Sequence, residues 1–401
     1  MTTTTEPVTP DATSDERDLL VDARGVEVHF PIKRGVVFDK VIGHVYAVDG
    51  VDLQIRRGET YGLVGESGCG KSTLGKAILN LEPPTDGSVL VDGTDVASLR
   101  GEELRRRRKD FQMVFQDPMS SLDPRQSVES LLVEGMKAHG LAKDEQATGR
   151  RLRELLSAVG LPAAALKKYP HEFSGGQRQR IGIARALAVE PKLIVADEPV
   201  SALDVSVQAQ VINLLEELQD EFDLTYLVIA HDLAVVRHIS DRIGVMYLGG
   251  LVEEAAADDL YATPLHPYTR ALLSAVPLPD PRAEDAREQI LLVGDLPSPS
   301  NPPTGCRFHT RCPWRQETRC DDERPQLRVV EVDGVPASHR VACHFAEQIA
   351  RGEIERHEVT ATATTQEWHG SDDGDAIGPA SLAEAQAMAK HTENQGGAGG
   401  F

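Results

Sequence analysis

The stretch Gly65–Thr73 reads GESGCGKST and matches the phosphate-binding pattern G-x-x-x-x-G-K-[S/T]. It follows a short apolar segment, Tyr61–Val64, which we predict to be a strand, and it opens a predicted helix, Lys71–Leu81. The motif requires this order of strand, glycine-rich turn and helix. Glycines allow backbone N–H groups to surround phosphate oxygens, and the helix N-terminus adds partial positive charge. The stretch therefore predicts a nucleotide site in an α/β fold.

Every position of this loop is a candidate ATP contact. We expect Lys71 to reach the β- and γ-phosphates and the Ser72 hydroxyl to bind Mg²⁺. Cys69 occupies a variable position of the pattern, and we interpret its side chain as a small filler. The candidates are Gly65, Glu66, Ser67, Gly68, Cys69, Gly70, Lys71, Ser72 and Thr73.

The composition bounds the possible classes of protein. The chain has 401 residues, enough for one large or two medium domains, and 40% of them are hydrophobic. It carries 42 basic and 63 acidic residues, a formal charge of −21. General nucleic-acid binding requires a basic face, so we expect no nucleic-acid partner.

No apolar run is long enough to span a bilayer, and the polar, acidic N-terminus lacks the pattern of a signal peptide. We therefore expect a cytosolic protein, or one that lies on the cytoplasmic face of the membrane through a partner. We predict disordered tails over residues 1–20 and 351–401, which are polar or rich in Thr, Ala, Gly and Asp.

Strands and helices alternate along the centre of the chain. Leu193–Asp197 and Thr225–Ala230 are predicted buried strands, residues 125–172 are mostly helical in pattern, and Val205–Leu218 has an apolar stripe of helical period. Such alternation predicts a parallel sheet with covered faces.

Two carboxylates, Asp197 and Glu198, end the first of these strands. Beside a phosphate loop, Asp197 can hold Mg²⁺. Successive side chains of a strand point to opposite sides, which leaves Glu198 free to polarise the water that attacks the γ-phosphate.

Further motifs resemble those of ABC-type ATPases. The segment PHEFSGGQRQRIGIARAL contains Ser174–Gln177 and is similar to the family's signature segment. Gln116 matches the Q-loop glutamine. Ser201–Asp204 matches the D-loop, and His231 matches the switch histidine. The resemblance implies an α/β ABC-type P-loop ATPase with a mixed or parallel sheet core, an antiparallel β subdomain and a helical subdomain. It places the ATP-binding domain at residues 21–272.

By this resemblance, ATP lies between two cassettes, with the Lys71 loop of one facing Ser174, Gly175, Gly176 and Gln177 of the other, near Asp204. Glu198 orients or deprotonates water, His231 contacts the γ-phosphate, and Gln116 contacts Mg²⁺. An aromatic residue stacks on adenine in this family; Phe30 is our first choice and Tyr46 the alternative.

Several segments narrow the resemblance to ATPase subunits of oligopeptide and dipeptide importers. They include VFQDPMSSLDPR, PLHPYTRALLSAVP and PPTGCRFHTRCP, and the resemblance covers roughly residues 21–346. It implies three kinds of partner: a sister ATPase, two membrane permease subunits and an extracellular solute-binding protein. A heterodimer with the sister ATPase is favoured, and a homodimer is possible. The resemblance also implies a peripheral location on the cytoplasmic face of the membrane. Close relatives serve nickel or sugars.

Four cysteines, Cys306, Cys312, Cys320 and Cys343, lie in a predicted small C-terminal domain at residues 273–350. Their spacing matches neither common ferredoxins nor paired zinc motifs. Some members of the resembled family carry a 4Fe–4S cluster on a matching set, so a 4Fe–4S cluster, zinc and unliganded thiols or disulfides all stay open.

Two other functional classes compete with transport. One is a soluble ABC ATPase that acts on ribosomes or DNA. ABC ATPases that act on ribosomes usually have two cassettes per chain, and those that act on DNA have a long coiled coil. Neither feature is found in this sequence. A redox- or iron-responsive regulator that uses the cysteines is the third class.

Overall fold

The computed structural model describes residues 19–34, 40–201, 203–276 and 289–359. The chain divides into two compact units, Met1–Val359 and Thr360–Phe401, and the second lies outside the described residues. The predicted tails therefore lie outside them too, except for residues 19–20 and 351–359. Strand β1 begins at Leu19, two residues before the boundary that we expected.

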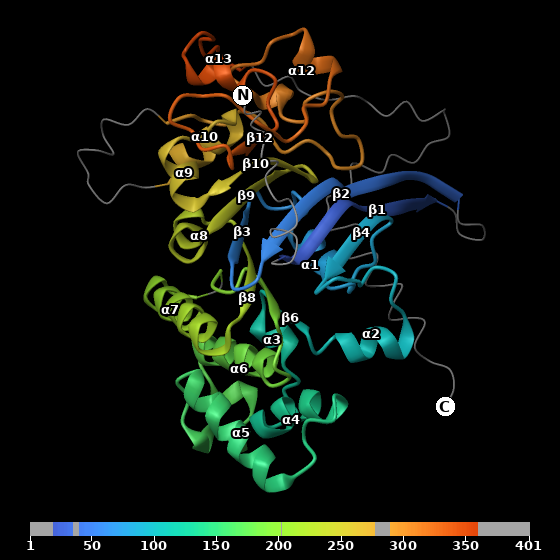
Figure 1. Cartoon of the computed structure of the whole chain (residues 1–401), viewed down its shortest axis with the longest axis vertical. Helices are drawn as coiled ribbons and strands as arrows, with labels where there is room; N and C mark the ends of the chain where they lie inside the picture. Colours follow the sequence, from blue (N-terminus) through green and yellow to red (C-terminus); the bar gives the residue numbers. More distant parts are fainter. Residues whose placement is uncertain (1–18, 35–39, 202, 277–288, 360–401) are drawn as a thin grey trace, which may run out of the picture. The chain divides into compact units, whose positions relative to one another are not determined.

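A mixed eight-stranded sheet forms the centre of the first unit, in the order β11-β12-β10-β9-β3-β8-β7-β6 (Figure 1). Its parallel strands are β3 (Thr60–Val64), β6 (Phe111–Val114), β7 (Leu193–Asp197), β8 (Thr225–Ala230) and β9 (Arg242–Tyr247). Every residue of β3, β7 and β8 is buried, as expected for a parallel sheet with both faces covered. Both predicted buried strands, β7 and β8, are confirmed residue for residue.

A second, antiparallel sheet has the order β2-β1-β4-β5. Its strands are β1 (Leu19–Arg34), β2 (Lys40–Arg56), β4 (Asp86–Val91) and β5 (Thr94–Asp95). Helix α1 (Lys71–Ile78) contacts strands of both sheets, and its Leu74 and Ile78 belong to the core that they share. The helix ends before the predicted Leu81 because Asn80 adopts a left-handed conformation, with φ of 49°.

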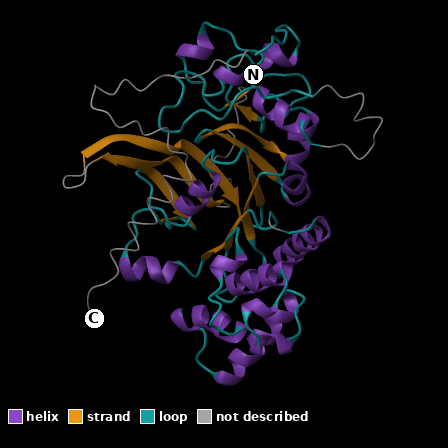
Figure 2. Cartoon of the chain, turned by 180° about the vertical axis from the view of Figure 1, so that it is seen from behind, coloured by secondary structure: helices purple, strands orange, loops and turns teal. Residues whose placement is uncertain are grey.

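A helical region is joined to the main sheet (Figure 2). Its helices α4, α5, α6 and α7 pack together through residues such as Leu131, Leu155, Ile183 and Leu215, in one core that also includes residues of β6, β7 and β8. Helix α7 continues to Phe222, past the predicted Leu218, and ends at Asp223 with φ of 52°. The helices of the described cassette are α2 (Gly101–Arg107), α3 (Pro118–Ser121), α4 (Val128–Ala138), α5 (Glu145–Ala158), α6 (Gly175–Leu187), α7 (Val205–Phe222), α8 (Leu233–Ile239), α9 (Ala257–Ala262) and α10 (Pro267–Ser274), with the 3₁₀ turns η2 (Ala163–Lys167) and η3 (Pro170–Glu172).

The C-terminal segment, residues 289–359, continues the cassette's own sheet. Strand β10 (Gly250–Ala256) pairs with β12 (Arg340–Val341), which pairs with β11 (Arg328–Val329). The segment adds the short helices η4 (His309–Arg311), α12 (Arg319–Asp322) and α13 (Ala346–Ala350). Its contacts extend past residue 350, where we had placed the start of the tail: His357 N–H donates to the Pro313 carbonyl at 2.9 Å.

Candidate functional site

The proposed catalytic groups lie at the carboxyl ends of neighbouring parallel strands. The phosphate loop follows β3, Asp197 and Glu198 end β7 or follow it, and His231 follows β8. Because β3 pairs with β8 and β8 with β7, these ends meet at one edge of the sheet. Ligands of parallel α/β sheets bind at this edge.

Two positions of the phosphate loop must be glycine because there is no room for a side chain. Gly65 and Gly70 have φ of 153° and 106°, and a Cβ on them would lie 2.2 Å from the Met246 carbonyl oxygen and 2.0 Å from that of Ala47, respectively. No side chain fits there, so the glycines allow the loop to pack directly on its neighbours. The buried Lys71 ammonium donates to the carbonyls of Gly65 at 2.8 Å and Glu66 at 2.9 Å.

The expected Mg²⁺ ligands are in contact. Ser72 Oγ donates to Asp197 Oδ1 at 2.7 Å. Burial raises the pKa of Asp197, and the hydrogen bond from Ser72 opposes this shift. A hydroxyl and a carboxylate oxygen at this separation suit Mg²⁺, which prefers oxygen ligands.

Two side chains contact Glu198. Gln116 Nε2 donates to Glu198 Oε2 at 2.7 Å, and His231 Nδ1 lies 3.4 Å from the same oxygen. Glu198 has φ of 45°, a left-handed conformation that turns its side chain away from the strand direction. Gln116 thus contacts Glu198, and its expected contact with Mg²⁺ stays a prediction.

The side chain and the backbone N–H of Glu66 are already bonded. Its carboxylate accepts from Arg311, and its N–H donates to Tyr268 Oη. We therefore expect Glu66 to shape the loop rather than to contact phosphate. Cys69 is 1% exposed within the apolar core, as the filler interpretation predicts. Sequence spacing contained no signal for Arg311 or Tyr268.

The signature residues form the N-terminus of α6. Ser174 is its N-cap, with Gln177 N–H donating to Ser174 Oγ and Ser174 N–H donating to Gln177 Oε1. The helix begins at Gly175, two residues before the predicted Gln177, because the N-cap serine satisfies the first turn. Within the described part of the chain, no hydrogen bond or ion pair joins these residues to Gly65–Thr73. Asp204 is the exposed N-cap of α7, while Ala202 of the same motif lies outside the described residues.

The two aromatic candidates for adenine differ in their surroundings. Phe30 packs against the apolar core shared by the two sheets. Tyr46 is partly exposed and precedes Ala47, whose carbonyl lies against Gly70 of the phosphate loop. Its ring contacts His29 edge-on at 4.7 Å. The surroundings favour Tyr46, the second choice from the sequence, over Phe30.

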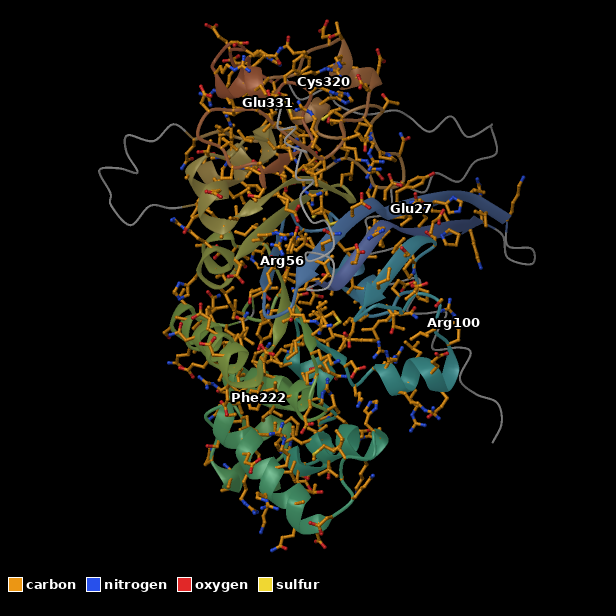
Figure 3. All side chains as sticks on the ribbon, viewed as in Figure 1. Glu27, Arg56, Arg100, Phe222, Cys320 and Glu331 are labelled. Atoms are coloured by element: carbon orange, nitrogen blue, oxygen red, sulfur yellow. The ribbon has the colours of Figure 1, made fainter. Side chains whose placement is uncertain are left out.

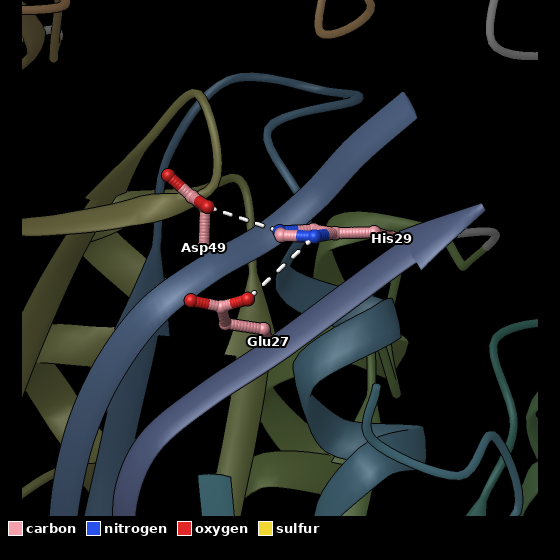
Figure 4. A group of neighbouring side chains, drawn as sticks. All are labelled: Glu27, His29 and Asp49. Atoms are coloured by element: carbon pink, nitrogen blue, oxygen red, sulfur yellow. Dashed lines mark hydrogen bonds and ion pairs between the residues drawn. The ribbon is translucent and has the colours of Figure 1, made fainter. Parts of the chain in front are cut away.

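Next to Tyr46, His29 lies between two carboxylates (Figure 4). Its Nε2 is 3.0 Å from Asp49 and its Nδ1 is 3.6 Å from Glu27. Burial raises the pKa of Asp49, but the guanidinium groups of Arg307 and Arg324 outweigh it and hold that pKa below its ordinary value. We interpret this group as an ion-pair network, since two guanidinium groups already neutralise the carboxylate that a metal ion would need.

The four C-terminal cysteines are free thiols, and Cys312 lies near enough to the other three for each of them to raise its pKa. Figure 3 labels Cys320. Burial raises the pKa of Cys306 to about 11 and that of Cys343 to about 12. Neighbouring cysteines also raise the pKa of both thiols. Backbone N–H groups of Phe308 and Trp314 donate to the sulfurs of Cys306 and Cys312. Among the described residues, no three of these sulfurs lie within 4.8 Å of one another.

Two family descriptions match the chain. Residues 48–201 match the ABC transporter family, and residues 252–320 match the oligopeptide/dipeptide transporter C-terminal region. The second match includes three of the four cysteines and ends at Cys320.

Similar proteins share nearly their whole length with this chain. The oligopeptide transport ATP-binding protein AppF of Bacillus subtilis (strain 168) is 53% identical over 334 residues, which cover 83% of this chain and 99% of AppF. The oligopeptide transport ATP-binding protein OppF of Salmonella typhimurium is 51% identical over 317 residues, 79% of this chain and 95% of OppF.

Solved structures support the fold. A post-hydrolysis dimer of the ATP-binding cassette MJ0796 bound to ADP and Pi is similar with a TM-score of 0.53 and 30% identity, over 59% of this chain and 98% of that one. With motifs, fold and relatives in agreement, the chain belongs to the ABC transporter ATPases, in the family of oligopeptide transport ATP-binding proteins.

Proposed function

We propose that this chain is the ATP-hydrolysing subunit of an ABC importer that takes up oligopeptides or dipeptides through membrane permease partners. The observation that carries the proposal is 53% identity over 99% of AppF, an oligopeptide transport ATP-binding protein. The match to the oligopeptide/dipeptide transporter C-terminal region adds to it, because that region lies outside the nucleotide-binding motifs. An importer of nickel or sugars is the alternative within the family.

The ATP site is shared between two cassettes. The phosphate loop of one chain binds the nucleotide together with Ser174–Gln177 of a second cassette, whose α6 N-terminus supplies N–H donors and partial positive charge. The sister cassette is a different ATPase in our preferred arrangement and a second copy in the alternative.

Each residue of the site has a role in hydrolysis. Lys71 binds the β- and γ-phosphates, and Ser72 with Asp197 holds Mg²⁺, which neutralises phosphate charge. Glu198 polarises the attacking water, His231 contacts the γ-phosphate, and Gln116 keeps Glu198 in place through their 2.7 Å hydrogen bond. The cassette spans residues 21–272 and is followed by the cysteine-bearing segment, 273–350.

The chain acts at the cytoplasmic face of the membrane, held there by two permease subunits, with a solute-binding protein on the other side. None of the helices in the described ranges is both long enough and apolar enough to cross a bilayer. Attachment through permeases is therefore the route that we propose.

The four cysteines hold a 4Fe–4S cluster in this proposal. Four buried or partly buried thiols that receive backbone N–H groups form a donor set of the right chemistry for a cluster. Among the described residues no three of their sulfurs lie within 4.8 Å of one another, which disfavours a single zinc ion. Cys306, Cys312, Cys320 and Cys343 would supply the ligands. Iron and acid-labile sulfide in anaerobically purified protein support the cluster, whereas zinc without iron contradicts it.

Uptake by cells tests the transport function. Cells that carry Lys71→Ala in place of the natural chain should lose ATP-driven uptake of labelled di- and oligopeptides. Unchanged peptide uptake with lost nickel or sugar uptake supports the alternative cargo, and co-sedimentation of the chain with ribosomes contradicts transport. The single-residue change leaves the permeases intact, so the effect isolates ATP binding.

A further inference from the structure

Two residues from outside the cassette motifs contact the second position of the phosphate loop. Arg311 Nη1 donates to both carboxylate oxygens of Glu66, at 2.9 and 3.1 Å, across 245 positions of sequence. Tyr268 Oη accepts from the Glu66 N–H at 2.8 Å. The side chain and the N–H of Glu66 are therefore both bound by residues C-terminal to the last cassette motif.

The surroundings of Arg311 leave it little freedom. It is 7% exposed, ends η4, and lies 6.0 Å above the Tyr247 ring. The rings of Tyr247, Tyr268 and Phe308 contact one another, with centroids 4.8 to 5.4 Å apart. An arginine and a tyrosine fixed by such packing can define the position of the residue that they contact.

The same segment also supports a second contact of the phosphate loop, indirectly. The Gly249 N–H donates to the Cys69 carbonyl at 2.8 Å, and the neighbouring Leu248 carbonyl accepts from Arg307. Residues 306–312, from Cys306 to Cys312, thus fix the loop directly through Arg311 and indirectly through Arg307.

These contacts continue to the phosphate-binding lysine. The carbonyl of Glu66 accepts from Lys71 Nζ at 2.9 Å, so Arg311, Glu66 and Lys71 form one connected chain of polar contacts. Phosphate loops act through donors held in place before the nucleotide arrives, and lost preorganisation lowers affinity.

We propose that Arg311, assisted by Tyr268, is a positioning residue of the ATP site. The cysteine-bearing segment then contributes directly to nucleotide binding. This inference rests on the proposed ATPase function. It extends that function by assigning the conformation of the phosphate loop to residues 202 and 245 positions away in sequence.

A double-mutant cycle on the full-length chain, purified anaerobically, tests the link. Arg311→Met, Glu66→Ala and the double variant are compared for binding of Mg-ATP by calorimetry. We expect Arg311→Met to raise the Kd by about tenfold in the natural background but by less than about twofold beside Glu66→Ala, as for residues in one network. Arg311→Lys should recover part of the lost affinity.

Arg315→Met is the matched control. Arg315 lies in the same segment and forms a bidentate ion pair with Asp321, at 2.9 and 2.6 Å, but does not contact the phosphate loop. It should leave the Kd for Mg-ATP unchanged, while thermal unfolding of each variant reports any general loss of stability.

The outcomes separate the inference from the proposed function. Equal effects of Arg311→Met in both backgrounds, or a lowered melting temperature with unchanged Kd, would overturn the positioning role. A natural chain that binds Mg-ATP but does not hydrolyse it with its partners present would instead contradict the proposed function. In that case the binding cycle still decides the role of Arg311.

Discussion

Ser72 Oγ and Asp197 Oδ1 lie 2.7 Å apart although 125 positions separate the two residues in sequence. The contact joins the start of α1 to the end of β7, and it brings a hydroxyl and a carboxylate to one point beside the phosphate loop. We propose that this pair of oxygens holds Mg²⁺ at the site.

Asp197→Asn should weaken Mg²⁺-dependent ATP binding, because the amide lacks the charge that attracts the metal. Turnover should fall by about 100-fold or more, since a bound metal stabilises the charge that develops in the transition state by several kcal/mol. Calorimetry with ATP in the presence of Mg²⁺ and of EDTA measures the effect. Asp220→Asn, an exposed change on α7, is the control. Equal losses with and without Mg²⁺ would argue against metal binding by Asp197.

Glu198→Gln should bind ATP normally and hydrolyse it slowly. The amide keeps the shape and can still accept the hydrogen bond from Gln116, but it cannot take a proton. Loss of a general base lowers rates by about 10²–10⁴-fold. Phosphate release and nucleotide binding should be measured on the same preparation, with Glu216→Gln as the surface control. Near-normal hydrolysis would remove Glu198 from the mechanism.

Tyr46→Ala should lower the affinity for ATP, because the partly exposed ring is lost from the neighbourhood of the phosphate loop. Stacking of a base on an aromatic side chain is worth about 1–3 kcal/mol. Tyr46→Phe should retain the affinity. Phe30→Ala, which removes a ring packed on the core, should lower the melting temperature with little effect on binding. The reverse pattern would restore Phe30 as the adenine contact.

Because of His266, the free energy of unfolding should fall as the pH is lowered. Burial lowers its pKa from 6.5 to about 4. Between these values the unfolded chain binds a proton that the folded chain does not, so stability present above pH 6.5 is lost as the pH falls towards 4. By linkage the loss is of the order of 3 kcal/mol.

His266→Asn isolates this effect. His266 caps α10 through Nδ1, which accepts from the Tyr268 N–H at 3.1 Å, and an asparagine oxygen can replace it. Urea denaturation at pH 7, 6 and 5 should give a shallower decline for the variant than for the natural chain. The exposed His238→Asn change should follow the natural chain. Identical slopes for all three proteins would exclude His266 as the source.

The predicted strands were accurate where the signal was local. Leu193–Asp197 and Thr225–Ala230 are strands as predicted, since a short, mostly apolar run has few alternatives once it is buried. Element ends were less accurate. The left-handed conformations of Asn80 and Asp223 stop α1 and α7, and apolar periodicity does not report them.

The amino-acid sequence by itself determined the kind of chemistry, because the phosphate loop, the carboxylate pair and the signature segment are each contiguous and act through backbone geometry close in the chain. Only the tertiary structure decided which distant groups meet: Gln116 with Glu198, Tyr46 beside Ala47 at the phosphate loop, and Arg311 with Glu66. Such contacts depend on how sheets and helices pack, across 82 positions for Gln116 with Glu198 and 245 for Arg311 with Glu66, and local spacing carries no information about that packing.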